Sequence, residues 1–405
     1  MPHCTCSMVW DEGTLNCIQF RFPIKKGGYL MFLKVPLKGS PFPISSISIQ
    51  KSSFRNNLTQ TIVKGAFADG GLGSGYNVKN ALYSGIGEYL ERITQIKPSH
   101  KLKSPYLDAY NISTERIEKI PIENVLIFDS NVFYADTDFK WNDSSGTAFH
   151  LYSYELLESS FSEFIERQSL VYNWLTKSPG KKIDLNRIGN DYFIKRTIQT
   201  LNGYFNKIEL FDISIHPYCH VVLTIGTGDY CKMAGLGAGW NLSKAVFSSV
   251  KETLQSISTM IPSHLHDINP DLLEHLNRGP IPKPKDKYSA HFQKLSTEEF
   301  QEEFSYLSKG YLKVNEDLSN KYKPSHKNYL SVLKEISKDL NIELLICYIP
   351  SIIDNIPGSV VRIMGKGAFP HIKSDEFDPY DFTIKNIDKL PIIKIPNWGR
   401  MIAFN

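Results

Sequence analysis

Three segments of the chain place apolar residues at the spacing of an amphipathic helix. In residues 79–95 the apolar residues recur at positions i, i+4, i+7 and i+8, starting from Leu82. Because an α-helix turns by about 100° per residue, these positions form one stripe that would face a core. Residues 154–175 and 243–260 follow the same frame. The sequence therefore predicts three helices with closely similar apolar faces.

Shorter runs between these helices are rich in β-branched and aromatic residues, as is typical of strands. These runs are Leu15–Phe22, Tyr29–Val35, Val125–Phe128, Lys207–Ile213, Val221–Ile225, Glu343–Ile349 and Ser359–Met364. Strands that alternate with helices indicate an α+β or mixed α/β architecture. The stretch Pro262–Lys287 is rich in Pro, His and Lys and predicts a stiff surface loop.

The polar faces of the three predicted helices also repeat. The pattern S-x3-E-x2-E-R gives Ser84, Glu88, Glu91 and Arg92 in the first helix, and Ser159, Glu163, Glu166 and Arg167 in the second. The third helix keeps the frame with Glu252, replaces the second Glu by Gln255 and lacks the Arg. Glu155 lies eight residues before Glu163, on the same polar face.

A segment of small residues precedes each helix: Gly70–Gly75, Ser144–Ala148 and Gly235–Gly239. Glycines ahead of a helix allow backbone N–H groups to approach an anion at the positive helix end. The alternative is that the glycines form turns and the polar residues form solvated faces. Three copies in one frame, each after such a segment, favour a functional site.

Clustered carboxylates repel one another unless cations lie among them. Oxygen ligands without thiols suit Mg²⁺, which usually also binds phosphate oxygens. The chain has no G-x4-G-K-[ST] sequence and no set of kinase motifs. The residues alone therefore indicate a site for Mg²⁺ and a nucleoside triphosphate that is built from several helices.

The segments SGIGEYLER, SSFSEFIER and VKETLQS resemble the three nucleotide-site helices of the YcaO-domain family. The resemblance is good over residues 60–260, weaker to about 370, and greatest to the YcaO subunit of microcin-type azole synthetases. It implies an α+β YcaO-type fold with mixed sheets and a non-Walker ATP site. We expect one domain, divided as N-terminal strands at 1–60, the nucleotide-binding part at 61–260, a variable insertion at 261–330, and C-terminal strands and tail at 331–405.

The resemblance also implies roles for individual residues. The expected metal ligands are Glu88, Glu91, Glu155, Glu163 and Glu166. The residues expected to line the ATP site are Ser84, Arg92, Ser159, Arg167, Glu252 and Gln255. Each arginine has an equal alternative, which is a structural ion pair with a neighbouring carboxylate. No catalytic group is assigned.

The implied reaction is ATP- and Mg²⁺-dependent cyclodehydration of a ribosomal precursor peptide, in which a backbone amide oxygen is phosphorylated and a Cys, Ser or Thr forms a thiazoline or oxazoline. The implied partners are an E1-like, leader-binding protein and a flavin dehydrogenase subunit. A second hypothesis is an enzyme with the same ATP site that forms a thioamide or amidine. A third hypothesis is that the protein is a noncatalytic scaffold subunit.

Composition and charge exclude several other classes of protein. The 405 residues are 41% hydrophobic and 22% charged, which is typical of a globular protein. A net charge of +4 gives no argument for nucleic acid, and no stretch approaches the length of apolar residues that spans a membrane. The N-terminus lacks the apolar run of a secretory signal, and the six cysteines are scattered. We expect a cytoplasmic protein with reduced thiols.

Overall fold

The computed structural model describes the chain in segments and divides it into two compact units, Met1–Phe161 with Leu345–Met364, and Ser162–Leu344 with Gly365–Asn405. The described residues are 5–8, 18–24, 28–36, 44–52, 58–65, 70–96, 104–127, 143–185, 191–228, 232–268, 287–309, 323–350, 358–386 and 395–404.

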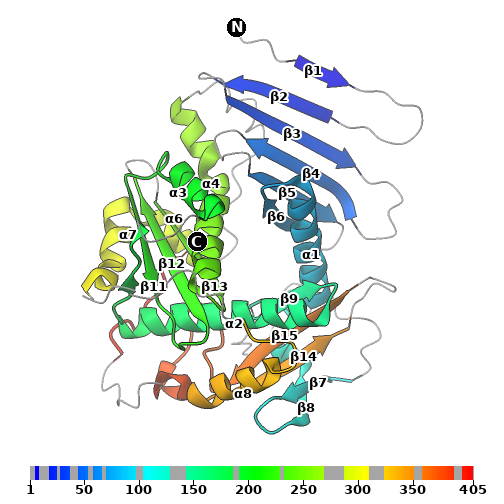
Figure 1. Ribbon diagram of the computed structural model, residues 1–405, viewed down its shortest axis with the longest axis vertical. Helices are drawn as coiled ribbons and strands as arrows, with labels where there is room; N and C mark the ends of the chain where they lie inside the picture. The colour runs from blue at the N-terminus through cyan, green and yellow to red at the C-terminus, as the bar shows by residue number, and fades with distance from the viewer. Residues whose placement is uncertain are drawn as a thin grey trace. The chain divides into compact units, whose positions relative to one another are not determined.

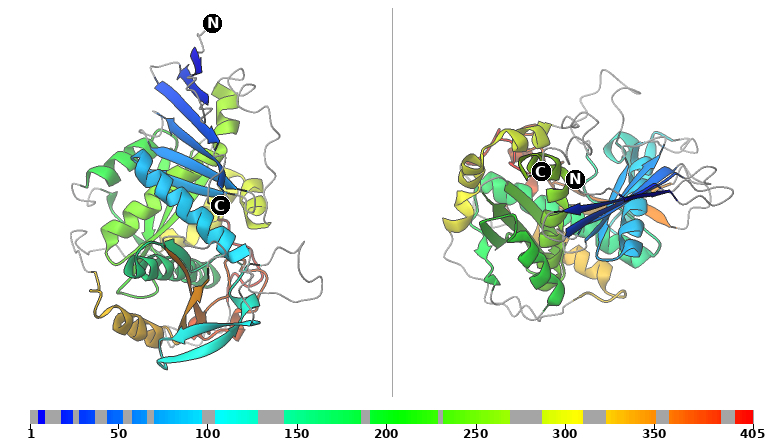
Figure 2. Two further views of the ribbon diagram at one scale, coloured as in Figure 1. Left: turned by 90° about the vertical axis from the view of Figure 1, so that its right-hand side faces the viewer. Right: turned by 90° about the horizontal axis from the view of Figure 1, so that it is seen from above.

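The first unit holds a six-stranded antiparallel meander in the order β1-β2-β3-β4-β5-β6. Its strands are β1 (Thr5–Met8), β2 (Ile18–Ile24), β3 (Gly28–Pro36), β4 (Ile44–Ser52), β5 (Thr59–Gly65) and β6 (Gly71–Gly75). Helix α1 (Val78–Ile96) follows β6 directly and lies along β5 and β6 (Figures 1 and 2). Tyr89, Leu90 and Ile93 of the helix pack with Ile44 and Val63 of the sheet to form its core.

A five-stranded sheet in the order β8-β7-β14-β15-β9 also belongs to this unit. Its strands are β7 (Tyr106–Asn111), β8 (Arg116–Pro121), β9 (Thr147–His150), β14 (Glu343–Ile349) and β15 (Ser359–Lys366), and the short 3-10 helix η2 (Ile122–Asn124) follows β8. Helix α2 (Ser153–Thr176) begins after β9 and continues into the second unit. Leu107, Ala109, Leu345 and Val360 are among the residues that form the core of this sheet.

The second unit is built on a four-stranded antiparallel sheet in the order β10-β11-β12-β13. Its strands are β10 (Lys181–Lys182), β11 (Lys207–Asp212), β12 (His220–Thr227) and β13 (Lys232–Gly239). Its other elements are α3 (Tyr192–Leu201), α4 (Leu242–Ile268), α6 (Lys287–Lys294), α7 (Thr297–Glu303), η4 (Ser305–Lys309), α8 (Tyr329–Asp339), η5 (Pro379–Asp381) and η6 (Thr383–Asn386). Helix α4 lies along β12 and β13, and α3 lies beside α4 (Figure 1).

Helices α1 and α4 approach their sheets so closely that side chains would not fit between them. A Cβ at Gly73 would lie 2.0 Å from the Ala81 carbonyl oxygen, and one at Gly235 would lie 2.5 Å from the Ser249 carbonyl oxygen. Such separations are far below van der Waals contact, so only glycine fits at these strand positions. The Thr61 hydroxyl, on β5, donates to the Ala81 carbonyl at 2.6 Å.

The same contact recurs at one offset in all three helices. The Ser160 hydroxyl donates to the Gly146 carbonyl at 2.6 Å, and the Ser249 hydroxyl donates to the Gly235 carbonyl at 2.8 Å, each across fourteen residues. In α1 the equivalent residue is Gly85, whose carbonyl would lie 2.0 Å from a Cβ at Gly71. The sequence repeat is therefore a repeat of one close contact between a helix and the small-residue segment before it. The residue that makes it follows Ser84, Ser159 or Ser248.

This geometry corrects the prediction that the small-residue segments are phosphate-binding loops ahead of the helices. The first and third segments form the strands β6 and β13, and most of their residues are buried. Their glycines are required because the helix backbone occupies the space that Cβ atoms would fill. The second segment includes a turn with Gly146 at φ 74°, a conformation that favours glycine, and ends in β9.

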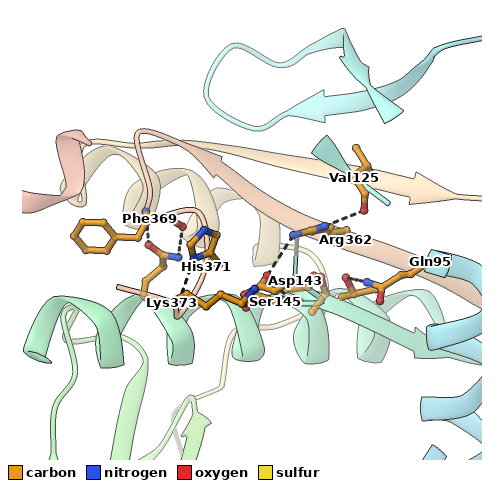
Figure 3. A network of polar contacts seen from close by, with 12 residues as sticks. Gln95, Val125, Asp143, Ser145, Arg362, Phe369, His371 and Lys373 are labelled. Carbon is orange, nitrogen blue, oxygen red and sulfur yellow. Dashed lines mark hydrogen bonds and ion pairs between the residues drawn. The ribbon is translucent and has the colours of Figure 1, made fainter. Parts of the chain in front are cut away.

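Arg362 of β15 holds the segment that leads into β9 (Figure 3). Its side chain is almost fully buried, and Nη1 donates to the Val125 carbonyl at 2.9 Å. Its Nη2 lies 3.6 Å from Asp143 Oδ1, and the carboxylate of Asp143 accepts the Ser145 amide at 2.9 Å. Removing either partner would leave a buried charge unpaired, so this pair fixes the turn that precedes α2.

Two sequence predictions about elements were wrong. Val125–Phe128 was expected to be a strand, but the amides of Val125 and Leu126 bond back to the Ile122 carbonyl in a turn. Both side chains are fully buried, so the apolar run reflects burial without strand pairing. The loop expected over Pro262–Lys287 was wrong at its start, because α4 continues to Ile268, and at Lys287, which begins α6. Residues 269–286 lie outside the described segments.

The main sequence predictions of the fold are confirmed. The three helices, expected at 79–95, 154–175 and 243–260, are α1, α2 and the first part of α4, and the class is α+β. Every strand pair whose register is described is antiparallel. In the described segments no helix has both the length and the apolar content to cross a membrane. Among the same residues Cys219 and Cys347 are buried free thiols.

Two glycines of α1 should respond differently to alanine. A Cβ at Gly85 would lie 2.7 Å from Thr61 Oγ1, whereas one at Gly87 would meet only the Phe149 ring at 3.4 Å. We expect Gly85→Ala to lower the free energy of unfolding by about 1–3 kcal/mol through overpacking. Gly87→Ala should be neutral or stabilising by up to about 1 kcal/mol, because alanine is the better helix former. Urea denaturation measures both, and equal effects would contradict the close contact at Gly85.

Candidate nucleotide and metal site

In the second unit, α2 and α4 bring acidic and basic side chains of the predicted site together. Glu163, Glu166 and Arg167 are on α2, and Glu252 is on α4. Glu166 accepts a hydrogen bond from the Ala238 amide of β13, and the charges of Glu163 and Glu252 act on it. Arg167 Nη1 lies 3.9 Å from Glu166 Oε1. The structure of this unit therefore brings these four side chains together, and their role in binding a ligand stays a prediction.

Burial dominates the electrostatics of this cluster. It raises the pKa of Glu166 to about 8, with Arg167 opposing the shift and Glu252 and Glu163 adding to it. Burial also raises the pKa of Glu252, against the Arg167 charge and the hydrogen bond from the Leu236 amide. A cation bound among these carboxylates would favour their ionised forms and offset the effect of burial.

In the first unit, Glu88 is held in the same manner. Its Oε2 accepts the Leu72 amide of β6 at 2.9 Å, and its Oε1 pairs with Arg92 one turn along α1. Burial raises the pKa of Glu88, while Arg92 and the Leu72 amide oppose the shift. Glu252 accepts the Leu236 amide of β13 at 3.3 Å. Each glutamate lies sixteen residues after its strand amide, so Glu88 and Glu252 are structural equivalents.

The strands that carry these amides stand at the edges of their sheets. β6 ends the six-stranded sheet, and β13 ends the four-stranded sheet. An edge strand exposes amides that need a partner, and the following helix supplies a carboxylate for one of them. Glu88 and Glu252 therefore have a structural role whatever else they bind.

The other predicted residues occupy accessible or partly buried positions. Ser84 on α1 and Ser159 on α2 are exposed, and Glu91, Glu155 and Gln255 are half-buried on α1, α2 and α4. Glu88, Glu91 and Glu155 belong to the first unit, and Glu163 and Glu166 belong to the second. That all five share one metal site stays a prediction.

Several residues near this cluster were not singled out by the sequence. Burial lowers the pKa of Lys251 on α4, and the neighbouring Glu252 opposes that shift. The Phe404 ring is buried, and its centroid lies 5.8 Å from the Arg167 guanidinium carbon. The Ala238 amide is a backbone donor to Glu166, which residue type alone does not reveal. To find this donor, one would need to know how α2 packs against β13.

The donor chemistry of the cluster fits a hard cation. Within the described segments, no group of three or more His, Cys, Asp or Glu side chains is arranged as a ready metal site. Magnesium rarely needs one, because it usually binds through one or two carboxylates, waters and the phosphates of a nucleotide. Glu163 and Glu166 present carboxylates, and Arg167 and Lys251 place positive charges on the same two helices, so the cluster has the donor types that such a site needs.

Comparison with known proteins identifies the protein family to which this chain belongs. A family model described as a YcaO cyclodehydratase that binds ATP and Mg²⁺ matches residues 99–364. The chain belongs to the YcaO family, and ATP and Mg²⁺ are the cofactors of that family. Its curated relative, the microcin B17-processing protein McbD of Escherichia coli, is 29% identical over 169 residues. That match spans 39% of this chain and 41% of the relative.

Solved structures confirm the YcaO fold. The E. coli microcin synthetase McbBCD complex with pro-MccB17 bound contains a chain with a TM-score of 0.67 and 19% identity, over 92% of this chain and all of that one. YcaO from Methanopyrus kandleri, bound with AMPPCP and Mg²⁺, gives a TM-score of 0.58 and 14% identity, over 81% of this chain and 86% of that one. At such low sequence identities, the structural similarity establishes the fold of this chain and nothing about its activity.

The raised pKa of Glu166 predicts how stability depends on pH in the metal-free protein. The carboxyl binds its proton more tightly in the folded state, with a pKa of about 8, than in the unfolded chain, whose value is 4.5. Between these values the unfolded state carries fewer protons, so stability falls as pH rises. We expect Glu166→Gln to remove this loss, which is on the order of a few kcal/mol.

Denaturation with chelator present, from pH 5 to 8.5, measures this difference. The variant and wild type should have similar stability at the acidic end, and the variant should be more stable at the alkaline end. Glu302→Gln, a change on the exposed surface of α7, is the matched control and should retain the wild-type slope. Parallel profiles for wild type and Glu166→Gln would show that Glu166 ionises normally.

Proposed function

We propose that this protein is the ATP- and Mg²⁺-dependent cyclodehydratase subunit of a complex that modifies a ribosomal precursor peptide. Its reaction would activate a backbone amide oxygen by phosphorylation and close a Cys, Ser or Thr side chain into a thiazoline or oxazoline. Support comes from family membership together with likeness to McbD and to the McbBCD complex.

One observation carries the proposal. Glu166 accepts a backbone amide from β13 in a buried cluster with Glu163, Glu252 and Arg167. These residues are the ones that the repeated motif placed on the polar faces of two helices. On a solvated surface, four such side chains would not be withdrawn from solvent together, whereas here all four are partly buried.

The residues of this chain would have distinct tasks. Glu163 and Glu166, with Glu88, Glu91 and Glu155, would hold Mg²⁺, which neutralises phosphate charge when bound. Arg167 would approach the transferring phosphate, where a guanidinium stabilises the charge that develops. The amides of Leu72, Leu236 and Ala238 would keep three carboxylates in fixed orientations. Ser84, Ser159, Arg92 and Gln255 would complete the nucleotide contacts.

The relatives support partner proteins and a precursor peptide. McbD is a processing protein of microcin B17, and the McbBCD complex is solved with pro-MccB17 bound. The finer expectation, an E1-like, leader-binding protein and a flavin dehydrogenase subunit that act with this chain, comes from the family resemblance of the sequence. Positioning of the peptide by a partner would supply a large part of the rate, because orientation lowers the entropic barrier.

Neutral replacement of the proposed metal ligands tests the site. Glu91→Gln and Glu166→Gln should each reduce ATP turnover to background in the assembled complex, because each removes a charge needed for Mg²⁺ while keeping the side-chain shape. The fold should remain intact, since both side chains lie off the buried apolar stripe. Phosphate release and circular dichroism measure the two effects.

Glu302→Gln on α7 serves as the control here as well and should turn over ATP like wild type. Near-normal phosphate release in both site variants would exclude Mg²⁺ ligation by Glu91 and Glu166. Absence of ATP binding by the wild-type complex at millimolar Mg²⁺ would favour the scaffold interpretation over any ATP-dependent reaction.

Reconstitution tests the partnership. The chain alone should modify precursor peptide slowly or not at all, and addition of the partner proteins should yield products that have lost one water for each ring. Mass spectrometry of the peptide measures the change. Efficient ring formation by the isolated chain would refute the need for partners, and incorporation of sulfide without water loss would indicate a thioamide-forming enzyme.

A further inference from the structure

Lys251 is a basic residue of α4 that the repeated motif does not include. It directly precedes Glu252, and its side chain is half-buried. The charge of Glu252 acts on it, but among the described residues no hydrogen bond or ion pair holds its ammonium group. Lysine is seldom withdrawn from water without such a partner. The surroundings of Lys251 therefore suit an anion that these residues do not supply.

The packing of α4 does not depend on Lys251. Val250 and Leu254 are fully buried in the apolar stripe of the helix, and Ser249 and Thr253 are fully buried against β13, along which the helix lies (Figure 1). Because successive residues of a helix are about 100° apart, Lys251 lies outside both sets, on the polar side of the helix. The buried faces of α4 are thus complete without it.

The other two motif helices have small residues at the position of Lys251. Gly87 precedes Glu88 in α1, and Ser162 precedes Glu163 in α2. The strand–helix arrangement that α1 and α4 share therefore forms without a long side chain at this position. Lys251 is a feature of α4 alone, and the repeated contact gives no reason for it.

The charge of Lys251 opposes folding in the absence of a ligand. Burial lowers the pKa of its ammonium group, and the Glu252 charge only partly counters that shift. A lysine whose folded-state pKa is lowered destabilises the folded state at neutral pH, because the unfolded chain binds the proton more tightly. Groups that lower stability in this way are typical of binding sites, where a ligand compensates for them.

Two cations from different helices act on one carboxylate. Glu252 senses the charges of Arg167 on α2 and Lys251 on α4, and it acts in turn on Glu166. Magnesium takes carboxylate and phosphate oxygens together, and Lys and Arg are the usual donors to the remaining phosphate oxygens. A phosphate group is therefore the anion that suits both the carboxylates and the two cations.

We infer that Lys251 binds a phosphate group of the nucleotide, to whose oxygens its ammonium group donates. This inference rests on the proposed function, since the phosphate is that of the proposed ATP. Lys251 has the compact charge that suits a phosphate oxygen, whereas Arg167 has a planar guanidinium. Glu252 keeps the ammonium group close to the carboxylates of α2 before the nucleotide binds.

Lys251→Met tests the inference through stability, without any enzymatic assay. Methionine has nearly the same length and no charge. In the full chain with chelator and no nucleotide, we expect its melting temperature to equal that of wild type or to exceed it by a few degrees, because a poorly compensated charge is removed. With ATP and Mg²⁺, the wild type should gain more in melting temperature than the variant, because it binds the nucleotide more tightly.

Isothermal titration of the assembled complex measures the affinity directly. Lys251→Met should weaken ATP binding by about tenfold or more, which is the effect of losing a charged phosphate donor. Lys251→Arg keeps the charge and should retain most of the affinity. Lys338→Met removes a lysine from the exposed surface of α8 and should bind ATP like wild type. Titration with ADP locates the contact, since a loss seen only with ATP would place Lys251 at the γ-phosphate.

The outcomes separate this inference from the proposed function. Wild-type affinity for ATP in the Lys251→Met complex would overturn the inference and leave the function standing. Absence of ATP binding by the wild-type complex at millimolar Mg²⁺ would overturn both. A melting temperature of nucleotide-free Lys251→Met well below wild type would show that Lys251 stabilises the fold, and that result would also refute the inference.

Discussion

The structure depends on how closely three helices approach the strands before them. In α1 and α4 the helix backbone lies where strand side chains would otherwise be, so glycine at positions such as Gly73 and Gly235 is a steric requirement. The Ser249 hydroxyl of α4 donates to the Gly235 carbonyl of β13, and the Ser160 hydroxyl of α2 donates to the Gly146 carbonyl in the turn before β9. A contact this tight fixes both the rotation and the height of each helix against its strand.

The arrangement of the candidate site follows from that contact. Once α1 and α4 are fixed, Glu88 and Glu252 reach the edge-strand amides of Leu72 and Leu236. The carboxylates are therefore oriented by the backbone before any ligand binds, which is the condition for effective electrostatic stabilisation. The same burial raises their pKa values and makes the site favourable for a cation.

The sequence predicted what depends on local pattern. The frame shared by Glu88, Glu163 and Glu252 identified the helices and their polar faces because helical periodicity is a local property. It did not identify the role of Gly85, Ser160 and Ser249, each of which contacts a backbone group fourteen residues earlier in the chain.

The glycine segments show why a motif can mislead about structure. Glycine ahead of a helix is compatible both with a phosphate-binding loop and with a strand under a closely packed helix. Choosing between these requires the partner strand, and the pairing of β12 with β13 involves residues that no local window links to α4. The exposure of Tyr192 and Phe193 was missed for a different reason, since both are residue types common in cores and only the structure shows that they are exposed.

The fixed offset between strand and helix also limits how this protein can evolve. Residues 76 and 77 are all that separate β6 from α1, and residues 240 and 241 are all that separate β13 from α4. One inserted residue would rotate the following helix by about 100° and turn its glutamate away from the strand amide. Insertions and deletions should therefore be excluded from these two connections in descendants of this sequence, however freely residues are exchanged elsewhere.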